Sequence, residues 1–325
     1  MSDSIGVLLM NLGGPPDLAA VPKFMYALFC DRQIIQFPGG PLLQKPFAWL
    51  LTRLRTRKVQ AQYASIGGGS PLLRWTSIQA RLLEERLNGE GGSGVGDQGS
   101  GIRALERRFK VGIAMRYHHP RASEVTLYPQ YSTATTGSSI RDLDRASLGP
   151  AKDFQITYID RYHNHPLYLD ALAARVKEGL AAMADEFRDE TVLLFSAHGL
   201  PKRLIEKGDP YVDQVKSTME GVLSRLHRPY EHCLGFQSRV GPIEWIGPET
   251  SDLIRKLAES GKRAVLAVPV AFVSDHIETL HEIDQVYSKL ARDAGISCFR
   301  RSPSINDSRL FADALADLVK AHLTT

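Results

Sequence analysis

The sequence is poor in cysteine: among its 325 residues only Cys30, Cys233 and Cys298 occur, far apart and without a C-x-x-C pair. This spacing argues against a disulfide framework and against a metal site made of cysteines alone. Long hydrophobic runs are also missing, because stretches such as Ile5–Leu12 and Ala264–Val273 fall well short of the roughly 20 residues that span a bilayer. No signal peptide is visible at the N-terminus, so we expect a cytoplasmic protein.

The chain has little net charge. Forty Lys and Arg residues against 36 Asp and Glu residues give a net charge of +4, and this balance gives no reason to expect a nucleic-acid partner. Apolar residues make up 43% and aromatic residues 8% of the chain, which is typical of a folded soluble protein. The length suffices for one large or two medium domains.

Common nucleotide and hydrolase motifs are absent as well: there is no G-x-x-x-x-G-K-[ST], G-x-S-x-G or H-E-x-x-H. One formal G-x-G-x-x-G occurs at Gly94, Gly96 and Gly99, inside the glycine-rich stretch 89–101. A dinucleotide fingerprint must follow a strand, whereas a charged helical pattern precedes this one. We therefore interpret the stretch as a flexible surface loop.

Short apolar runs alternate with amphipathic segments along most of the chain. The runs predict buried strands at Ile5–Met10, Val111–Met115, Phe154–Ile159, Val192–Ala197 and Ala264–Val270. Helical spacing predicts helices at Leu18–Phe29, Ser77–Leu87, Leu167–Ala184, Tyr211–Leu226, Pro248–Ser260, Ile277–Ala294 and Arg309–His322. The alternation predicts an α/β protein with parallel sheets, arranged as two similar lobes that meet near residues 158–167.

A histidine directly follows one of these strands. In S-A-H-G-L-P, His198 comes after the run Val192–Phe195, and Gly199 and Pro201 indicate a sharp turn. Ligands of parallel α/β folds bind beyond the carboxyl ends of the strands, which makes His198 a candidate site residue. An isolated histidine at such a place more often only caps a turn, so this feature alone assigns no function.

A second cluster of ionisable residues follows the strand at Ala264–Val270. Asp275, His276, Glu278, His281 and Glu282 occur within eight residues. The helix dipole favours acidic residues at a helix N-terminus, which explains Asp275 and Glu278 but not His276. Glu278 and Glu282 share one helix face, a costly like-charge pair unless cations or protons pass along it. Imidazole and carboxylate groups suit a divalent metal such as Fe²⁺, bound transiently, or proton removal near neutral pH.

Longer motifs around these residues resemble the signatures of the ferrochelatase family, whose members insert Fe²⁺ into a porphyrin. They include L-F-S-A-H-G-L-P (194–201), G-D-P-Y (208–211) and S-D-H-I-E-T-L-H-E-I-D (274–284). Further matches in the family's order are N-L-G-G-P (11–15), Q-Y-x-x-I-G-G-G-S-P (62–71), Y-P-Q-Y-S-T-A-T-T-G-S-S (128–139) and F-Q-S-R-V-G-P-I-E-W-I-G-P (236–248). The resemblance implies two Rossmann-like lobes of the class II chelatase type, residues 1–160 and 161–325, with a porphyrin cleft between them. The C-terminal helix, residues 307–323, would pack back on the first lobe.

The resemblance also implies roles for individual residues. His198 and Glu278 match the family's central histidine and glutamate on opposite sides of the macrocycle, where one takes pyrrole protons and the other handles metal. A polar path toward this pair would consist of Asp275, His276 and Glu282. Positions that contact the porphyrin match Leu12, Arg32, Tyr63, Ser70, Arg116, Tyr117, Tyr128 and Trp245. Among these, Arg32 would lie near the pocket mouth and could pair with a propionate.

The chain departs from the family pattern in two places. Animal members carry an iron–sulfur cluster on a cysteine-rich tail and a cysteine in the Y-P-Q-Y-S loop, whereas this chain has Thr133 there and no such tail. We therefore expect no iron–sulfur cluster and no permanently bound cofactor. The family also has a helix and the start of a strand between H-P and Y-P-Q-Y-S, where only Arg121–Leu127 intervene here. This short connection predicts a loosened first lobe, with amide exchange in residues 121–135 fast relative to Val192–Ala197.

Three interpretations remain open besides a ferrochelatase that takes protoporphyrin and Fe²⁺ as substrates. One is a chelatase for coproporphyrin or another porphyrin. A second is a cobalt or nickel chelatase for a sirohydrochlorin-type ring, although such relatives lack the G-G-G-S-P and Y-P-Q-Y-S segments. The third is a silent tetrapyrrole carrier, which His198 and Glu278 argue against because a carrier needs no proton acceptor.

An amphipathic segment in the first lobe predicts peripheral contact with an anionic membrane surface. Five apolar residues at helical spacing lie beside four basic ones: Leu43, Phe47, Leu50, Leu51 and Leu54, with Arg53, Arg55, Arg57 and Lys58. The alternative is an ordinary helix packed on its own lobe.

Overall fold

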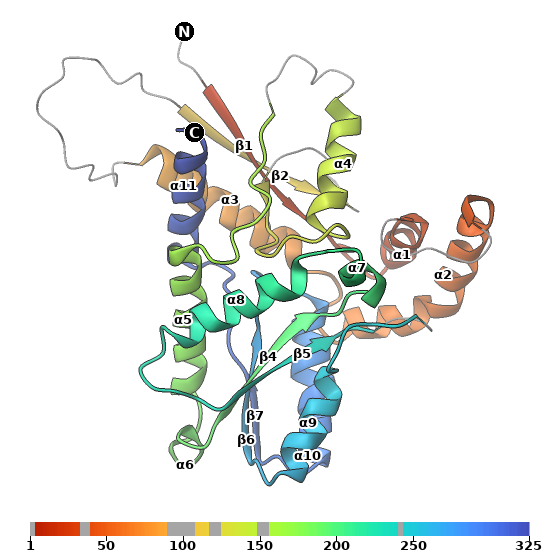
Figure 1. Cartoon of the computed structure of the whole chain (residues 1–325). Coiled ribbons are helices and arrows are strands. Elements are labelled where there is room, and N and C mark those ends of the chain that lie inside the picture. Colours follow the sequence, from red (N-terminus) through yellow and green to blue (C-terminus); the bar gives the residue numbers. More distant parts are fainter. Residues whose placement is uncertain are drawn as a thin grey trace, which may run out of the picture.

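The computed structural model describes residues 4–32, 40–89, 108–116, 125–147, 156–239 and 243–324. Its first sheet has three parallel strands in the order β2-β1-β3 (Figure 1). The strands are β1 (Ser4–Asn11), β2 (Arg108–Met115) and β3 (Val125–Thr126). In register, Met10 of β1 lies between Ala114 of β2 and Thr126 of β3. The helices of this half are α1 (Val21–Cys30), α2 (Gly40–Ala64), α3 (Leu72–Asn88) and α4 (Thr136–Ser147).

The second sheet has four parallel strands in the order β5-β4-β6-β7. The strands are β4 (Val192–His198), β5 (His232–Gln237), β6 (Ala264–Pro269) and β7 (Cys298–Arg301). The helices are α5 (Pro166–Ala181), α6 (Asp185–Arg188), α7 (Lys202–Glu206), α8 (Tyr211–Leu223), α9 (Thr250–Glu259), the π-helix η1 (Glu278–Tyr287), α10 (Ser288–Asp293) and α11 (Arg309–His322).

The central strand β4 is covered on both faces. Leu193 and Phe195 are fully buried in a cluster with residues of α5 and α8, whereas Leu194 between them is buried with residues of α9, η1 and α10. Successive side chains of a strand point to opposite faces, so each face of the sheet packs against its own helices. The α/β fold with parallel sheets is confirmed, and strands lie where four of the five apolar runs predict them.

One predicted strand, Phe154–Ile159, is wrong in the part that the structure describes. Residues 154 and 155 lie outside the described residues, 156–158 form no strand, and Ile159 makes a single bridge. The edge strand β3 is only two residues long, so a further strand beside it would have little backbone to pair with. Conversely, β5 and β7 were not predicted from the sequence. Both lie at the edges of their sheet and therefore do not need a continuous apolar run.

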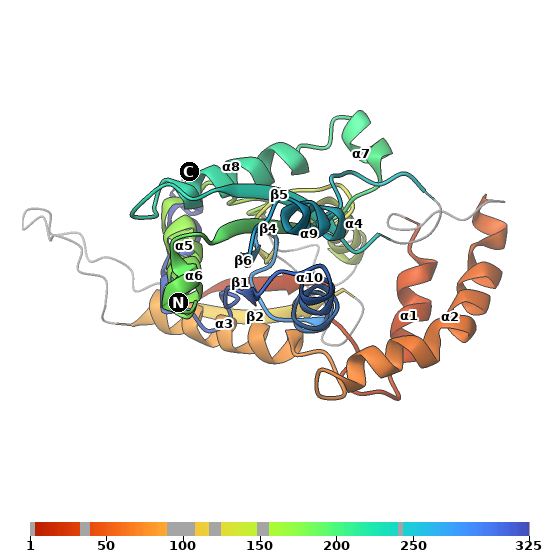
Figure 2. The same ribbon diagram turned by 90° about the horizontal axis from the view of Figure 1, so that it is seen from below.

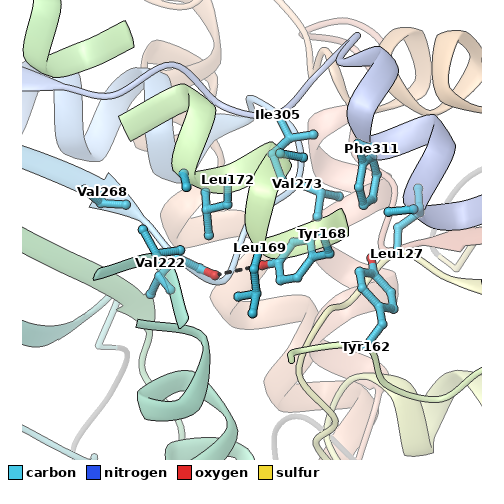
Figure 3. Close-up of a cluster of buried hydrophobic side chains, with 14 of the residues drawn as sticks. Leu127, Tyr162, Tyr168, Leu169, Leu172, Val222, Val268, Val273, Ile305 and Phe311 are labelled. Carbon is cyan, nitrogen blue, oxygen red and sulfur yellow. Dashed lines mark hydrogen bonds between the residues drawn. The ribbon is translucent and has the colours of Figure 1, made fainter. Parts of the chain in front are cut away.

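Helix α11 joins the two halves of the chain. Its Phe311 is fully buried, with ring centroids 6.1 Å from Tyr162 and 6.3 Å from Tyr168 (Figure 3). α11 packs on α3 of the first half and on α5 of the second. The same apolar cluster takes in Leu127, just after β3, and Val268 of β6. A continuous core thus runs through both halves, and the domain boundary at residues 160/161 stays a prediction.

The loop after β3 is held from the second half of the chain. Tyr131 N donates to Gln214 Oε1 at 2.7 Å. The Asp209 carboxylate accepts hydrogen bonds from Ser132 Oγ at 3.0 Å and from both Thr133 N and Thr133 Oγ1 at 2.8 Å. These polar contacts fix the loop although β3, which precedes it, is very short.

We predict slow amide exchange at Tyr131 and Thr133, approaching that of β4, because each N–H has a side-chain acceptor from the second half. Asp209→Asn weakens the acceptor of Thr133 and should speed exchange there without affecting β4. Hydrogen exchange followed by NMR measures both. Fast exchange throughout residues 125–135 in the parent protein would contradict this anchoring and support the loosened first lobe expected from the short connection.

Candidate active site

His198 stands at the carboxyl end of β4, on a turn that requires glycine next to it. A Cβ at Gly199 would lie 2.9 Å from the carbonyl oxygen of Gln237, the last residue of β5. Gly199 N donates to that oxygen at 2.8 Å. The Tyr211 hydroxyl donates to the His198 carbonyl oxygen at 3.0 Å. These contacts fix the backbone that carries the imidazole.

Glu278 is the first residue of η1, and its carboxylate lies between two imidazoles. Oε1 lies 3.2 Å from Nδ1 of His198, and Oε2 lies 3.0 Å from Nε2 of His276. His276 N donates to Thr279 Oγ1 at 3.0 Å, which secures the turn before the helix. π-helical turns are rare and often mark functional sites. The two sequence candidates, which follow different strands, thus form one His198–Glu278–His276 cluster.

The cluster is partly accessible. The His198 side chain is 34% exposed and that of Glu278 23%, whereas His276 is 10% exposed and packs against the Phe272 ring at 4.5 Å. Because His198 and Glu278 are in contact, no macrocycle fits between them. The arrangement on opposite sides of the ring, which the resemblance implied, is therefore wrong for this structure.

Glu278 is the electrostatic centre of the site. Burial alone would lower the pKa of His198, but the charges of Glu278 and Glu282 outweigh it and raise the pKa above its ordinary value of 6.5. Burial would raise the pKa of Glu278, yet His198 and His276 hold it well below its usual range. Burial, reinforced by the Glu278 charge, also raises the pKa of four tyrosines: Tyr63, Tyr128, Tyr211 and Tyr287. The charge of Glu278 thus disfavours ionisation of all four phenols.

We predict that Glu278→Gln lowers the pKa of His198, because the amide removes the nearest negative charge while burial remains. NMR titration of the imidazole measures this shift, and the exposed Glu186→Gln on α6 serves as the control. An unchanged or higher His198 pKa would contradict the electrostatic coupling.

In the parent, the His198 contribution to stability is complete below pH 6.5 and is lost as pH rises through its raised pKa. That of Glu278 is complete above pH 4.5 and is lost as pH falls, so the pair stabilises the fold most between these values.

Comparison with known proteins decides the family. The family model described as Ferrochelatase matches residues 4–323. This chain belongs to the ferrochelatase family. The ferrochelatase of Geotalea daltonii is 43% identical over 99% of this chain and 98% of that protein. The ferrochelatase of Thermosynechococcus vestitus is 42% identical over 99% of this chain and 83% of that protein.

A solved structure supports the ferrochelatase-type fold. The structure titled "SirB from Bacillus subtilis with Fe3+" covers 98% of this chain and 94% of its own, with a TM-score of 0.50 and 9% sequence identity. At this identity the likeness concerns the fold alone. It agrees with the class II chelatase architecture that the family resemblance predicts.

Asp275, one of the three residues that the ferrochelatase resemblance assigns to a polar path, is enclosed by donors. Its Oδ1 accepts from Arg301 Nη1 at 3.0 Å and from Ser304 Oγ at 2.7 Å, and its Oδ2 accepts from Asn306 Nδ2 at 2.8 Å. Burial would raise the pKa of Asp275, but Arg301 and these hydrogen bonds lower it. Asp275 thus anchors the turn before His276.

Glu282, a second path residue of the ferrochelatase pattern, joins η1 to the end of β5. Its carboxylate accepts from Gln237 Nε2 at 2.9 Å, Ser238 N at 3.1 Å and the Tyr287 hydroxyl at 3.0 Å. Gln237 Nε2 also donates to the Glu278 carbonyl oxygen at 3.0 Å. Of the three predicted path residues, His276 is the one whose side chain contacts the Glu278 carboxylate.

The predicted porphyrin-contacting residues fall into several places. The Arg116 guanidinium is buried and bonded to Asp31 and Ser138, whereas the adjacent Arg32 is exposed. Tyr117 lies outside the described residues. The Tyr128 hydroxyl is buried, and the pKa of this group responds to both Arg116 and Glu278. These bonds of Arg116 thus stay within the first half of the chain, and the charge of Glu278 acts on Tyr128 across the two halves.

The remaining porphyrin-contacting candidates lie near the ends of β1 and α2 and beside the turn that carries His198. Tyr63 and Ser70 pack against Gly14, where an added Cβ would lie 2.4 Å from Ser70 Cβ and 3.9 Å from the Tyr63 hydroxyl. Leu12 follows the last residue of β1 and is half-buried. Trp245 pairs with Pro201 through a backbone bridge beside the His198 turn. A cavity of about 330 Å³ between α3, α5 and α11 contains none of these residues, so the porphyrin cleft stays a prediction.

Sequence reasoning missed three residues that shape the site: Gln237, Tyr211 and Arg301. Gln237 ends a strand that the apolar pattern did not predict, so its place at a carboxyl end went unnoticed. Tyr211 belongs to the G-D-P-Y motif, which was the available signal. Arg301 sits in a short polar strand far from the other motifs, and nothing in its surroundings in the sequence marks it.

Proposed function

We propose that this protein is a ferrochelatase that inserts Fe²⁺ into protoporphyrin IX and releases two protons. Its family and its full-length relatives support this activity. The observation that carries the proposal is the Glu278 carboxylate held between His198 and His276, with 23% of its side chain exposed. A metal chelatase needs proton acceptors and metal ligands at one place, and this cluster contains both.

The chemistry follows from the three side chains. Replacing two pyrrole protons by Fe²⁺ requires acceptors close to the ring nitrogens, and neutral imidazole is suited to this task near neutral pH. The Glu278 carboxylate stabilises an imidazolium on either neighbour, so protons can be taken up without isolating a buried charge. Its oxygens also suit Fe²⁺ as it is transferred. Fe²⁺ is a substrate here, and the proposal includes no resident cofactor or iron–sulfur cluster.

Metal insertion into free-base protoporphyrin IX tests this function. The porphyrin loses its fluorescence when it takes up Fe²⁺ under anaerobic conditions, or shifts its emission with Zn²⁺. We expect saturable, catalytic turnover with many porphyrins metallated per protein. Stoichiometric porphyrin binding without insertion would contradict the enzymatic function and indicate a porphyrin carrier. Insertion into coproporphyrin but not protoporphyrin would support a metal chelatase and contradict protoporphyrin as its substrate.

We further propose that the enzyme is cytoplasmic and acts at the inner face of the cell membrane, docked through α2. This helix and α1 project from one end of the molecule in both views (Figures 1 and 2). The outward face of α2 carries large apolar side chains: Leu42 at 88% exposure, Leu54 at 70% and Trp49 at 55%, with Leu43 and Leu50 beside them. The predicted face differs in part, because Leu51 packs inward against α1 and Phe47 is half-buried. No helix in the described ranges is long and apolar enough to cross a bilayer.

Basic residues accompany this apolar face, which favours an anionic surface. Arg53 lies over the Trp49 ring, 5.6 Å from its centroid, and Arg57 and Lys58 are exposed one turn further on. We predict flotation with phosphatidylglycerol vesicles at low salt and its loss in the double variant Trp49→Ser, Leu54→Ser. Substituting Leu310 and Leu323, exposed on the opposite end of the chain, provides a matched control. Absence of binding by the parent at low salt would contradict membrane docking but not metal insertion.

A further inference from the structure

We propose that Arg301 is a positioning residue for metal insertion: it holds the segment that carries His276 and Glu278 in the geometry the cluster needs. The inference rests on the proposed function, and it concerns a side chain that contacts none of the three cluster residues in the described structure.

Arg301 ends β7, and its guanidinium binds two carboxylates at once. Nε and Nη2 donate to Asp284 Oδ1 and Oδ2 at 2.8 and 2.9 Å, a two-pronged pair. Nη1 donates to Asp275 Oδ1 at 3.0 Å. The Arg301 side chain is 11% exposed and that of Asp275 16%, whereas Asp284 is 35% exposed. All three bonds join charged groups, which makes them stronger than neutral hydrogen bonds.

The two carboxylates bracket the catalytic segment. Asp275 precedes Glu278 by three residues, and Asp284 follows it by six, inside η1. Arg301 therefore closes a loop around His276 and Glu278, tying both of its ends to the sheet. Nη1 also donates to Ser304 Oγ at 3.2 Å, and Ser304 in turn donates to Asp275. Arg301 at the end of β7 and Ser304, three residues later, thus both hold Asp275 in place.

The two ion pairs of Arg301 matter for the geometry because the cluster is assembled from separate elements. His198 comes from β4, whereas His276 and Glu278 come from a turn and the start of a π-helix, a form with poorer packing along its axis than an α-helix. A displacement of Glu278 by about 1 Å would separate it from one of the imidazoles, and misplacement of this size can cost on the order of 10²-fold in rate. Lysine cannot replace the guanidinium, since it offers one charged nitrogen without the planar pair of donors that binds Asp284.

The alternative is that Arg301 only neutralises the charges of Asp275 and Asp284 and so supports stability. Arg301→Lys keeps the charge while it removes the two-pronged geometry, and Arg300→Lys, at the exposed neighbouring position, is the matched control. We expect Arg301→Lys to lower kcat for Zn²⁺ insertion by about 10- to 100-fold. The porphyrin Kd and the folded fraction at the assay temperature should stay near parental values. Arg300→Lys should leave kcat unchanged.

A double-mutant cycle decides between the two roles. If Arg301 acts through Glu278, Arg301→Lys loses most of its effect on kcat in a Glu278→Gln background, with a residual factor below about two. An equal loss in both backgrounds, or a parental kcat in a folded Arg301→Lys protein, would overturn the proposal.

A second readout is independent of activity. The ring nitrogen resonances of His198 and His276 should move in Arg301→Lys and not in Arg300→Lys. A parent protein without metal insertion would overturn the proposed function, whereas the resonances would still report whether Arg301 positions the cluster. Unmoved resonances would overturn the positioning role even in an active enzyme.

Discussion

Replacement of His198 by alanine is expected to lower kcat for metal insertion by about 10²–10⁴-fold, the cost typical of losing a general acid–base group. Porphyrin affinity should change little, because a planar macrocycle is held by apolar area and by partners of its carboxylates rather than by one imidazole. Glu278→Gln keeps the side-chain shape and removes the charge that both imidazoles contact, so it should act in the same direction. Steady-state insertion rates and porphyrin quenching titrations give the two quantities separately.

His232→Ala provides the control, since this histidine is exposed on the edge strand β5 and hydrogen-bonds to the nearby Tyr230 carbonyl oxygen. It should insert metal at the parental rate. The assignment of His198 and Glu278 would be wrong if either variant kept near-parental turnover while His276 or Glu282 proved essential. A parallel loss of turnover and porphyrin affinity in His198→Ala would instead indicate a binding role for the imidazole.

Phe311→Ala is expected to destabilise the fold by about 3–5 kcal/mol, the range for deleting a buried aromatic ring from a core. The ring is fully buried against Tyr162 and Tyr168 (Figure 3). Urea unfolding followed by circular dichroism measures the loss. The adjacent Leu310→Ala, at a site 45% exposed, should change stability by about 0.5 kcal/mol or less.

The same experiment tests whether the two halves share a core. Because residues of both sheets meet in the cluster around Phe311, the parent should unfold in one cooperative transition that the variant shifts as a whole. Two separable transitions, of which Phe311→Ala moves only one, would contradict a continuous core and favour independently folding lobes.

The sequence was most informative where a strand is buried on both faces. Runs such as those of β4 and β6 have no polar position to confuse the pattern, and their limits were predicted to within a residue or two. The edge strands of the second sheet were not predicted. One of them, β7, has the sequence Cys-Phe-Arg-Arg, and only one of its two edges forms backbone hydrogen bonds within the sheet. The π-helix escaped too, because its side-chain spacing is close to that of the α-helix predicted for residues 277–294.

For the site, position after a strand indicated His198 and the cluster between Asp275 and Glu282, and the family resemblance selected Glu278 within that cluster. Neither placed the two side chains relative to each other. Their contact joins residues 80 positions apart, and only tertiary structure shows that it leaves no room for a ring between them. The pairing of Arg116 with Asp31, 85 residues away, was hidden for the same reason. Family motifs indicate which residues matter, whereas the hydrogen-bond partners of those residues depend on how distant segments pack.

Single-turnover insertion tests most directly whether the His198–Glu278–His276 cluster carries the chemistry. Protein saturated with protoporphyrin IX is mixed with excess Fe²⁺ without oxygen, and the metallated porphyrin is followed by its absorbance. Each protein molecule metallates only the porphyrin that it already holds, so slow product release cannot mask the result. We expect the parent to metallate its bound porphyrin in one rapid phase, and Glu278→Gln to do so at least about 10²-fold more slowly. Equal rates for the two proteins would show that the metal enters the ring without this carboxylate.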